Sequence, residues 1–329
     1  MKHTIKIALA VLIAVSIITA GVIVFKSVIS KGAEQNIRIT VVFKSLNEGM
    51  EFWDVVQAGI DVAAKEFGAK TEVLGAKYER EISRQIEILD GVIEKKPDAI
   101  VLVAADYNQL VPSVKKIKSA GIKLITIDSG INSDLPESFI ATDNVQAGVK
   151  AGLEMAKLVD KDSEVAILSH VKGTATAIER EQGVRKGLAQ SKITRIEDTL
   201  FSENNQEKAT SIIKQLLYDK PQTAGIVCLN ETSTLGAARA IKELNLAGKV
   251  KLVGFDGSIN EVKLIEKGVI QATVVQKPFN MGYTGIEMAV RSIKGEKIKK
   301  RIDTGSVIVT KNNIYSPENE KLLFPFVDK

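Results

Sequence analysis

Residues 252–258 read LVGFDGS, and this short stretch indicates how the chain folds. Leu252, Val253 and Phe255 are typical of a buried strand, which delivers one carboxylate, Asp256, to a glycine-flanked turn. In an open α/β sheet, ligands bind outside the carboxyl ends of the strands, so Asp256 is well placed to contact one. The alternative is that Asp256 begins the next helix as an N-cap that accepts backbone amide protons.

An apolar strand followed by an amphipathic helix is a pattern that repeats on both sides of this stretch. Strands that alternate with helices of this length are typical of βαβ units with right-handed crossovers. Strands are expected at 37–44, 71–74, 99–104, 123–127 and 139–142, and again at 164–169, 196–201, 225–229, 250–254 and 271–275. Helices are expected between them at 51–67, 80–94, 109–119, 146–158, 176–190, 206–218 and 232–244.

Two such runs predict an α/β protein with two doubly wound, Rossmann-like lobes and a ligand cleft between them. A helix at 281–293 and a strand at 306–309 come after Pro278, which indicates that the chain crosses back and that each lobe is discontinuous. The N-terminal lobe is therefore expected to contain residues 36–142 and 277–303. The C-terminal lobe is expected to contain residues 143–276 and 304–329.

The first residues of the chain predict a membrane segment. Residues 7–25 carry no charge and are nearly all apolar, close to the ~20 residues with which a helix crosses a bilayer core. A cleaved signal peptide also begins with lysines before an apolar run, but its apolar run is usually ~7–15 residues long. No A-x-A site closes the run before Lys26, and no cysteine follows it as in a lipoprotein. Residues 1–35 are therefore expected to be an uncleaved transmembrane signal anchor and tether, with cleavage as the alternative.

Composition excludes several functions. The formal charge is +5, but Lys and Arg are scattered among Asp and Glu, which argues against nucleic-acid binding. Cys228 is the only cysteine and lies in an apolar run, and His3 and His170 are the only histidines. A metal site or a catalytic triad is therefore not expected, and no cofactor is implied. No G-x-G-x-x-G follows a strand and no G-x-x-x-x-G-K-[ST] occurs, which argues against an enzyme.

Polar side chains follow several of the expected strands. Asp128, Asn230 and Gln276 each come directly after a strand, and Arg180 lies early in a helix. Each of these residues could instead have a purely structural role. Asp128 and Asn230 are common in helix caps and turns, and Gln276 could lie in a hinge. Together these side chains can satisfy the clustered hydroxyls of a sugar, and aromatic rings can cover its C–H faces. Phe52 and Trp53 supply two adjacent rings near the first strand, although Phe52 also suits a core position.

Seven segments occur in the order found in the periplasmic sugar-binding proteins of the ribose-binding type, and the chain resembles that family over residues 37–309. They are ITVVFKSLNEGMEFW, ITIDSGI, ATDNVQAG, GTATAIEREQG, LNETSTLGAARAI, LVGFDGS and QATVVQKP. The resemblance implies that the lobes are joined by a three-crossover hinge and close on a sugar. By motif position, it implies that Phe52 and Trp53 stack on the sugar and that hydrogen bonds come from Asp128, Arg180, Asn230, Asp256 and Gln276, with Asp106 as an addition.

The sequence departs from the ribose-type pattern at two positions. Ser129 follows Asp128 where the family has an arginine, and Asn204 falls where an aromatic residue is often found. Lys44, after the first strand, is expected to supply the missing cation. These departures put ribose in doubt, and the apolar N-terminal segment makes the chain look like membrane-anchored binders of pentoses.

The function expected from this resemblance is a non-enzymatic receptor for a monosaccharide, with D-xylose the first choice. It would be anchored in the cell membrane with its binding domain outside the cytoplasm, and would signal to a sensor histidine kinase. The alternative is the substrate-binding component of an ABC sugar transporter, whose partner is a permease. A repressor related to the lactose repressor shares such a core, but a membrane-length apolar segment stands where its helix-turn-helix would be.

Overall fold

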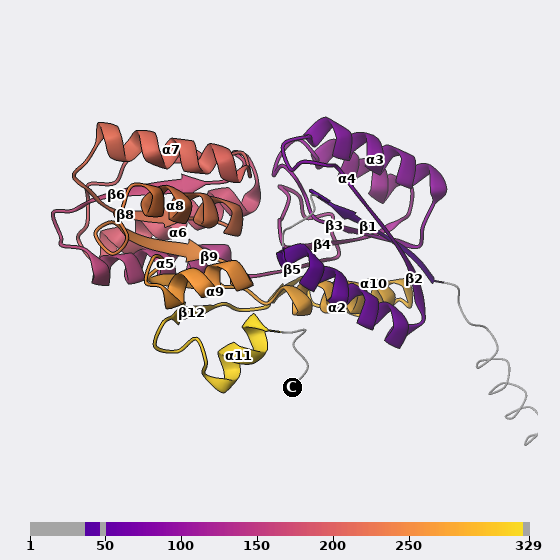
Figure 1. The fold of residues 1–329 in the computed structure, drawn as a ribbon. Helices are drawn as coiled ribbons and strands as arrows, with labels where there is room; N and C mark the ends of the chain where they lie inside the picture. The colour runs from indigo at the N-terminus through magenta and orange to yellow at the C-terminus, as the bar shows by residue number, and fades with distance from the viewer. Residues whose placement is uncertain (1–36, 47–50, 325–329) are drawn as a thin grey trace, which may run out of the picture. The chain divides into compact units, whose positions relative to one another are not determined.

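The computed structural model describes residues 37–46 and 51–324, which form two six-stranded sheets (Figure 1). The first sheet has the order β2-β1-β3-β4-β5-β11. Its strands are β1 (Ile37–Phe43), β2 (Ala69–Gly75), β3 (Ala99–Leu102), β4 (Lys123–Ile127), β5 (Ser138–Ala141) and β11 (Arg301–Asp303). The second has the order β7-β6-β8-β9-β10-β12. Its strands are β6 (Glu164–Ser169), β7 (Leu200–Phe201), β8 (Thr223–Cys228), β9 (Lys251–Phe255), β10 (Ala272–Val275) and β12 (Val307–Thr310).

Both sheets have the strand order of a doubly wound α/β domain, which confirms the predicted two-lobed α/β fold. In the first sheet β1, β3, β4, β5 and β11 pair in parallel, and in the second sheet β6 to β10 do so, whereas β12 runs antiparallel to β10. The chain passes between the sheets after β5, after β10 and after β11. The carboxyl ends of β1, β4, β6, β9 and β10 therefore place the residues that follow them where an α/β protein binds its ligands.

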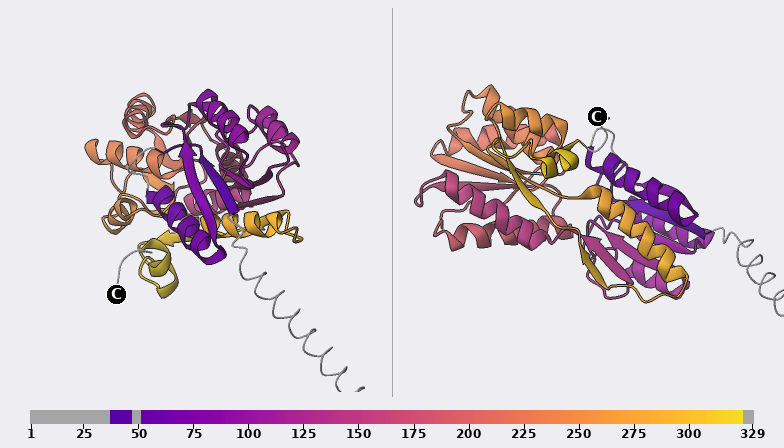
Figure 2. Two further views of the ribbon diagram at one scale, coloured as in Figure 1. Left: turned by 90° about the vertical axis from the view of Figure 1, so that its right-hand side faces the viewer. Right: turned by 90° about the horizontal axis from the view of Figure 1, so that it is seen from below.

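Helices cover both faces of each sheet (Figure 2). On the first sheet, α2 (Glu51–Phe67) and α10 (Pro278–Ile293) lie side by side on one face, and α3 (Ile82–Lys95) and α4 (Val111–Ser119) pack on the other. On the second sheet, one face carries α5 (Asn144–Leu158) and α6 (Ala175–Gln190). The opposite face carries α7 (Gln206–Asp219), α8 (Glu231–Glu243), α9 (Ile259–Glu266) and the short α11 (Pro317–Leu323).

Helices α5 and α6 approach so closely that only glycine fits between them. A Cβ atom on Gly183 would lie 2.1 Å from the carbonyl oxygen of Val145, and one on Gly148 would lie 2.3 Å from that of Arg180. A side chain at either position would push the helices apart. The glycines therefore fix α6 against the start of α5, which brings Arg180 to the first residue of α5, Asn144.

Three elements were not expected from the sequence. Helix α9 begins with a capping box, in which Ser258 accepts from the backbone of Glu261 and the Glu261 side chain accepts in return. Helix α11 starts at Pro317, a residue that is well suited to the first turn of a helix. Strand β11 is a three-residue edge strand. The strand expected at 196–201 is limited to β7, with one isolated bridge at Ile196.

The predicted signal anchor at 1–35 lies outside the described residues. Across 37–46 and 51–324, no helix combines the length and apolar character needed to span a bilayer.

Candidate functional site

A small cavity lies where residues of the two lobes meet. Its volume is about 30 Å³, roughly the space of one water molecule. The first lobe contributes residues after β1, β2 and β4 and from the first turn of α2, and the second lobe contributes residues after β6, β8, β9 and β10 and from α6. The lining is Lys44, Phe52, Trp53, Glu79, Asp128, His170, Thr176, Arg180, Asn230, Asp256 and Gln276. It brings together eight of the residues expected from the sequence.

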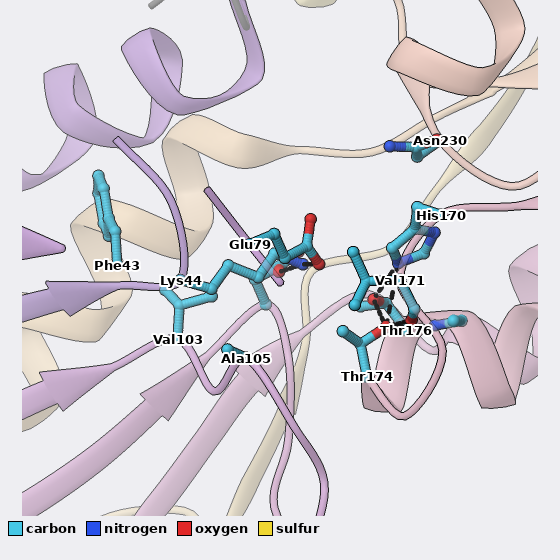
Figure 3. Close-up of polar contacts among 12 residues, drawn as sticks. Phe43, Lys44, Glu79, Val103, Ala105, His170, Val171, Thr174, Thr176 and Asn230 are labelled. Atoms are coloured by element: carbon cyan, nitrogen blue, oxygen red, sulfur yellow. Dashed lines mark hydrogen bonds and ion pairs between the residues drawn. The ribbon is translucent and has the colours of Figure 1, made fainter. Parts of the chain in front are cut away.

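A buried lysine organises the first-lobe side of the cavity (Figure 3). Lys44 Nζ lies 3.1 Å from Glu79 Oε1 and 3.2 Å from Asp128 Oδ2, and all three side chains are buried. Burial acts to lower the pKa of Lys44, but the carboxylates of Asp128 and Glu79 outweigh it and raise the pKa above its ordinary value. Lys44 therefore stays charged, and this triad presents fixed donors and acceptors to the cavity.

Two aromatic rings border the same side. Trp53 and Phe52 meet edge to face with ring centroids 4.9 Å apart, and Lys44 Nζ lies 5.6 Å from the Trp53 ring. Phe43 supports Trp53 from β1 at 5.1 Å. The indole nitrogen of Trp53 is buried and has no hydrogen-bond partner among the described residues. It is therefore a buried donor whose hydrogen bond is not satisfied by these residues.

Asp256 lies on the second-lobe side and does not start the helix that follows it. Helix α9 is capped by Ser258 instead. Asp256 Oδ2 accepts from the backbone nitrogen of Glu231, and Oδ1 accepts from Gln276 Nε2 at 2.7 Å. Burial raises the pKa of Asp256, while Arg180 and these two donors act to lower it. The N-cap alternative for the following helix is therefore wrong, and Asp256 instead holds the start of α8 to the end of β10.

Arg180 is held by neighbours at the back of the cavity. Its Nε donates to Asn144 Oδ1 and its Nη1 to the carbonyl oxygen of Leu229, both at 2.8 Å. The guanidinium lies 4.6 Å from the Phe255 ring centroid. These contacts fix its plane, so that Arg180 can act as a directional donor at the carboxyl ends of β8 and β9.

Asn230 caps a helix, as one of the two interpretations of the sequence predicted, and it also lies at the cavity. Its side chain caps α8 by accepting from the backbone of Ser233, and it also lines the cavity. Its Nδ2 donates to Asn204 Oδ1 at 2.8 Å. Asn204 itself does not line the cavity and supports Asn230 from behind.

Asp106 also lies outside the cavity lining. Its Oδ1 accepts from the backbone nitrogens of Asn108 and Gln109, and its Oδ2 accepts from Gln109 Nε2. It therefore shapes the turn after β3. In that turn, the backbone nitrogen of Tyr107 donates at 2.9 Å to the carbonyl oxygen of Gly173, which follows β6. Asp106 is thus part of a contact between the lobes.

The cavity also contains residues that were not expected from the sequence: Glu79, His170 and Thr176. His170 directly follows β6, so the rule that identified Asp128 and Gln276 applies to it equally. Burial, with Lys44 and Arg180 nearby, holds the pKa of His170 well below its usual range. Glu79 follows β2 only after a short connection, which hides its position at a strand end.

An acidic group lies beside the cavity. Glu231 and Glu261 are buried near Asp256, and Glu51 is close by. Burial and the charge of Asp256 raise the pKa of Glu231 to about 8, and burial and the charge of Glu231 raise that of Glu261 well above its usual range. At neutral pH the carboxyl group of Glu231 is therefore largely protonated. Within the described part of the chain, no group of three or more His, Cys, Asp and Glu side chains could hold a metal ion.

The chain belongs to the periplasmic binding protein family, because residues 39–297 match the periplasmic binding protein domain. It is 28% identical over 266 residues to the D-allose-binding periplasmic protein of Escherichia coli (strain K12), which covers 78% of this chain and 85% of that protein. These findings confirm the expected resemblance to ribose-type sugar-binding proteins.

Solved structures agree with this family assignment. The fold is similar to that of an ABC transporter solute binding protein from Agrobacterium vitis with bound D-fucose, with a TM-score of 0.84, 33% identity and 87% and 99% of the two chains covered. It is also similar to a sugar transporter from Clostridium phytofermentans, with a TM-score of 0.79, 39% identity and 84% and 99% covered. These relatives are sugar-binding or sugar-transport proteins, in agreement with the expectation that the chain is a binding protein and not an enzyme.

Proposed function

We propose that this protein is the monosaccharide-binding component of an ABC sugar transporter and that the cavity between its lobes is the sugar site. The observation that carries the proposal is the composition of the cavity. Rings, a fixed arginine and buried carboxylates and amides come from both lobes, and Trp53 Nε1 and Gln276 Oε1 are buried without a hydrogen-bond partner among the described residues. A polyhydroxylated ligand supplies both donors and acceptors to such groups.

The mechanism is closure of two lobes on the ligand. In this proposal, residues 36–142 with 277–303 and residues 143–276 with 304–329 rotate about the three connecting segments. A sugar contacts both lobes only in the closed state, so its differential affinity favours that state. The closed surface is then recognised by a permease.

The sugar contacts proposed for this site are Phe52, Trp53, Lys44, Asp128, Arg180, Asn230, Asp256 and Gln276. Glu79 and His170 are added to the proposal because they line the same cavity. The similar proteins include ones that bind the hexose-derived sugars D-allose and D-fucose and others that bind the pentoses D-arabinose and ribose. They support a monosaccharide without selecting D-xylose, which stays a prediction from the sequence.

A membrane-anchored sensor is the second candidate, favoured by the uncharged apolar run at residues 7–25. It would use the same closure to signal to a histidine kinase. The transporter relatives favour the first candidate. Affinity capture of the protein from its own membranes, with and without sugar, separates the two, because a permease is expected in one case and a kinase in the other.

A further inference from the structure

His170 lies at the sugar cavity but belongs to none of the charged or aromatic groups described above. It directly follows β6, is 2% exposed and lines the cavity together with Lys44, Arg180 and Asn230. Its ring is the only imidazole in the described part of the chain, because the other histidine is His3.

Two threonine hydroxyls fix the position of the ring proton (Figure 3). His170 Nε2 lies 2.9 Å from Thr176 Oγ1 and 3.1 Å from Thr174 Oγ1. Thr174 Oγ1 donates its single proton to the carbonyl oxygen of Val171, and Thr176 Oγ1 donates its proton to Thr174 Oγ1. With both hydroxyl protons placed in this way, the two hydroxyls accept from the ring and Nε2 carries the proton.

The other ring nitrogen must then be a bare acceptor. His170 Nδ1 is buried and has no hydrogen-bond partner among residues 37–46 and 51–324. The groups that face the ring, Lys44 and Arg180, are cationic, and together with burial they hold the pKa of His170 well below its usual range. The ring therefore stays neutral at neutral pH, and the lone pair on Nδ1 stays available.

We infer that His170 is a specificity-determining residue of the proposed sugar site, whose Nδ1 accepts a hydrogen bond from one hydroxyl of the ligand. The inference rests on the proposed function. It requires that the ligand carry a free hydroxyl at this position. A sugar analogue that has a hydrogen atom or an O-methyl group in place of this hydroxyl leaves the buried acceptor His170 Nδ1 unsatisfied. We expect such an analogue to bind with a Kd roughly 10- to 100-fold higher than that of the sugar.

Two substitutions separate this role from a purely structural one. In His170→Asn the amide oxygen can take the place of Nδ1, whereas in His170→Gln the amide nitrogen can take the place of Nε2 and keep the bond to the threonines. We expect His170→Asn to bind the sugar within about threefold of wild type and His170→Gln to bind roughly 10- to 100-fold more weakly. The reverse order, or equal losses, would overturn the inference.

Nitrogen NMR of the full-length protein, labelled with ¹⁵N-histidine, gives a direct test because the chain has two histidines. Before sugar is added, His170 should show a protonated Nε2 and a bare Nδ1. Titration with D-allose, D-fucose or D-arabinose, whichever binds most tightly, should shift the Nδ1 resonance as it accepts a hydrogen bond. Binding by calorimetry without a shift at Nδ1 overturns this inference alone, and no binding of any sugar overturns the proposed function with it.

Discussion

Gly173 lies where the two lobes touch beside the proposed sugar site, and its replacement by alanine should hinder closure. Its φ is +99°, and a Cβ atom on it would lie 2.4 Å from Asp106 Oδ2. Its carbonyl oxygen accepts the 2.9 Å bond from the backbone nitrogen of Tyr107. Gly173 follows a strand of the second sheet, whereas Asp106 and Tyr107 follow a strand of the first, so these contacts require the lobes to be close together.

Two penalties are expected from Gly173→Ala, and they act on different equilibria. A left-handed backbone costs an alanine about 1–2 kcal/mol, which lowers the free energy of unfolding in the open and closed states alike. An ordinary contact needs about 3.5 Å, so Asp106 Oδ2 must also move by about 1 Å and lose its bond from Gln109 Nε2. That loss, about 1–2 kcal/mol, falls on the closed state alone and should raise the Kd about 5- to 30-fold.

Calorimetric titration with the tightest-binding sugar, together with thermal unfolding, measures the two effects separately. Gly248→Ala is a matched control, because its φ is +78° and no atom lies within 4 Å of the added Cβ. It should lower Tm as Gly173→Ala does and leave Kd unchanged. In the Gly173→Ala, Asp106→Ala double variant the clash is absent, so its Kd should match that of Asp106→Ala alone. A wild-type Kd for Gly173→Ala, or purely additive losses in the double variant, would refute the reasoning.

Three further predictions concern the charged groups of the site. Asp256→Asn should raise the Kd for sugar roughly 10- to 100-fold in calorimetry, because an amide nitrogen then faces a donor, either Gln276 Nε2 or the Glu231 backbone. Lys44→Met should lower the free energy of unfolding in urea by about 3–5 kcal/mol, because Glu79 and Asp128 lose their shared buried cation. Glu231 has a pKa of about 8 in the fold against an ordinary 4.5, so its stabilising proton is fully bound below that ordinary value and is lost as the pH rises through about 8. Glu231→Gln should therefore flatten the decline of Tm between about pH 5 and 9, as followed by thermal unfolding.

Each of these predictions has a clear contrary outcome. Asp160→Asn, on the exposed surface of the same lobe, is the control for Asp256→Asn and should bind as wild type. An equal effect of the two variants would contradict a contact role for Asp256. Adding Glu79→Gln to Lys44→Met should restore part of the lost stability, and a further loss would argue against the triad. Parallel curves of Tm against pH for Glu231→Gln and wild type would show that Glu231 does not hold the proton.

The alternation of strands and helices made the two-lobed fold predictable, because each βαβ unit is recognisable from a short stretch of sequence. The strand-end rule also identified Asp128, Asp256 and Gln276, since a polar residue directly after an apolar strand is visible in the sequence. The same rule applies to His170 after β6. In the sequence, however, a histidine is more readily recognised as a metal ligand or a catalytic base than as a hydrogen-bonding residue at a strand end.

What could not be predicted are partners that come from distant parts of the chain. Asp256 accepts a hydrogen bond from the backbone nitrogen of Glu231, 25 residues earlier, and not from the helix that follows it in the sequence. Asn204, considered as a sugar contact, accepts a hydrogen bond from Asn230, 26 residues later. Glu79 approaches Lys44 only because β1 and β2 are neighbours in the sheet. Such contacts depend on sheet order and on side-chain rotamers, which residue types alone do not specify.

The most direct test of the central claim is calorimetric titration of the folded protein with a panel of monosaccharides that includes D-allose, D-fucose, D-arabinose and D-xylose. The account predicts saturable binding of at least one of them with a stoichiometry of about one, as a single cleft between two lobes requires. It also predicts that Asp256→Asn weakens that binding while the protein stays folded. A folded protein that releases no heat with any monosaccharide would contradict the account.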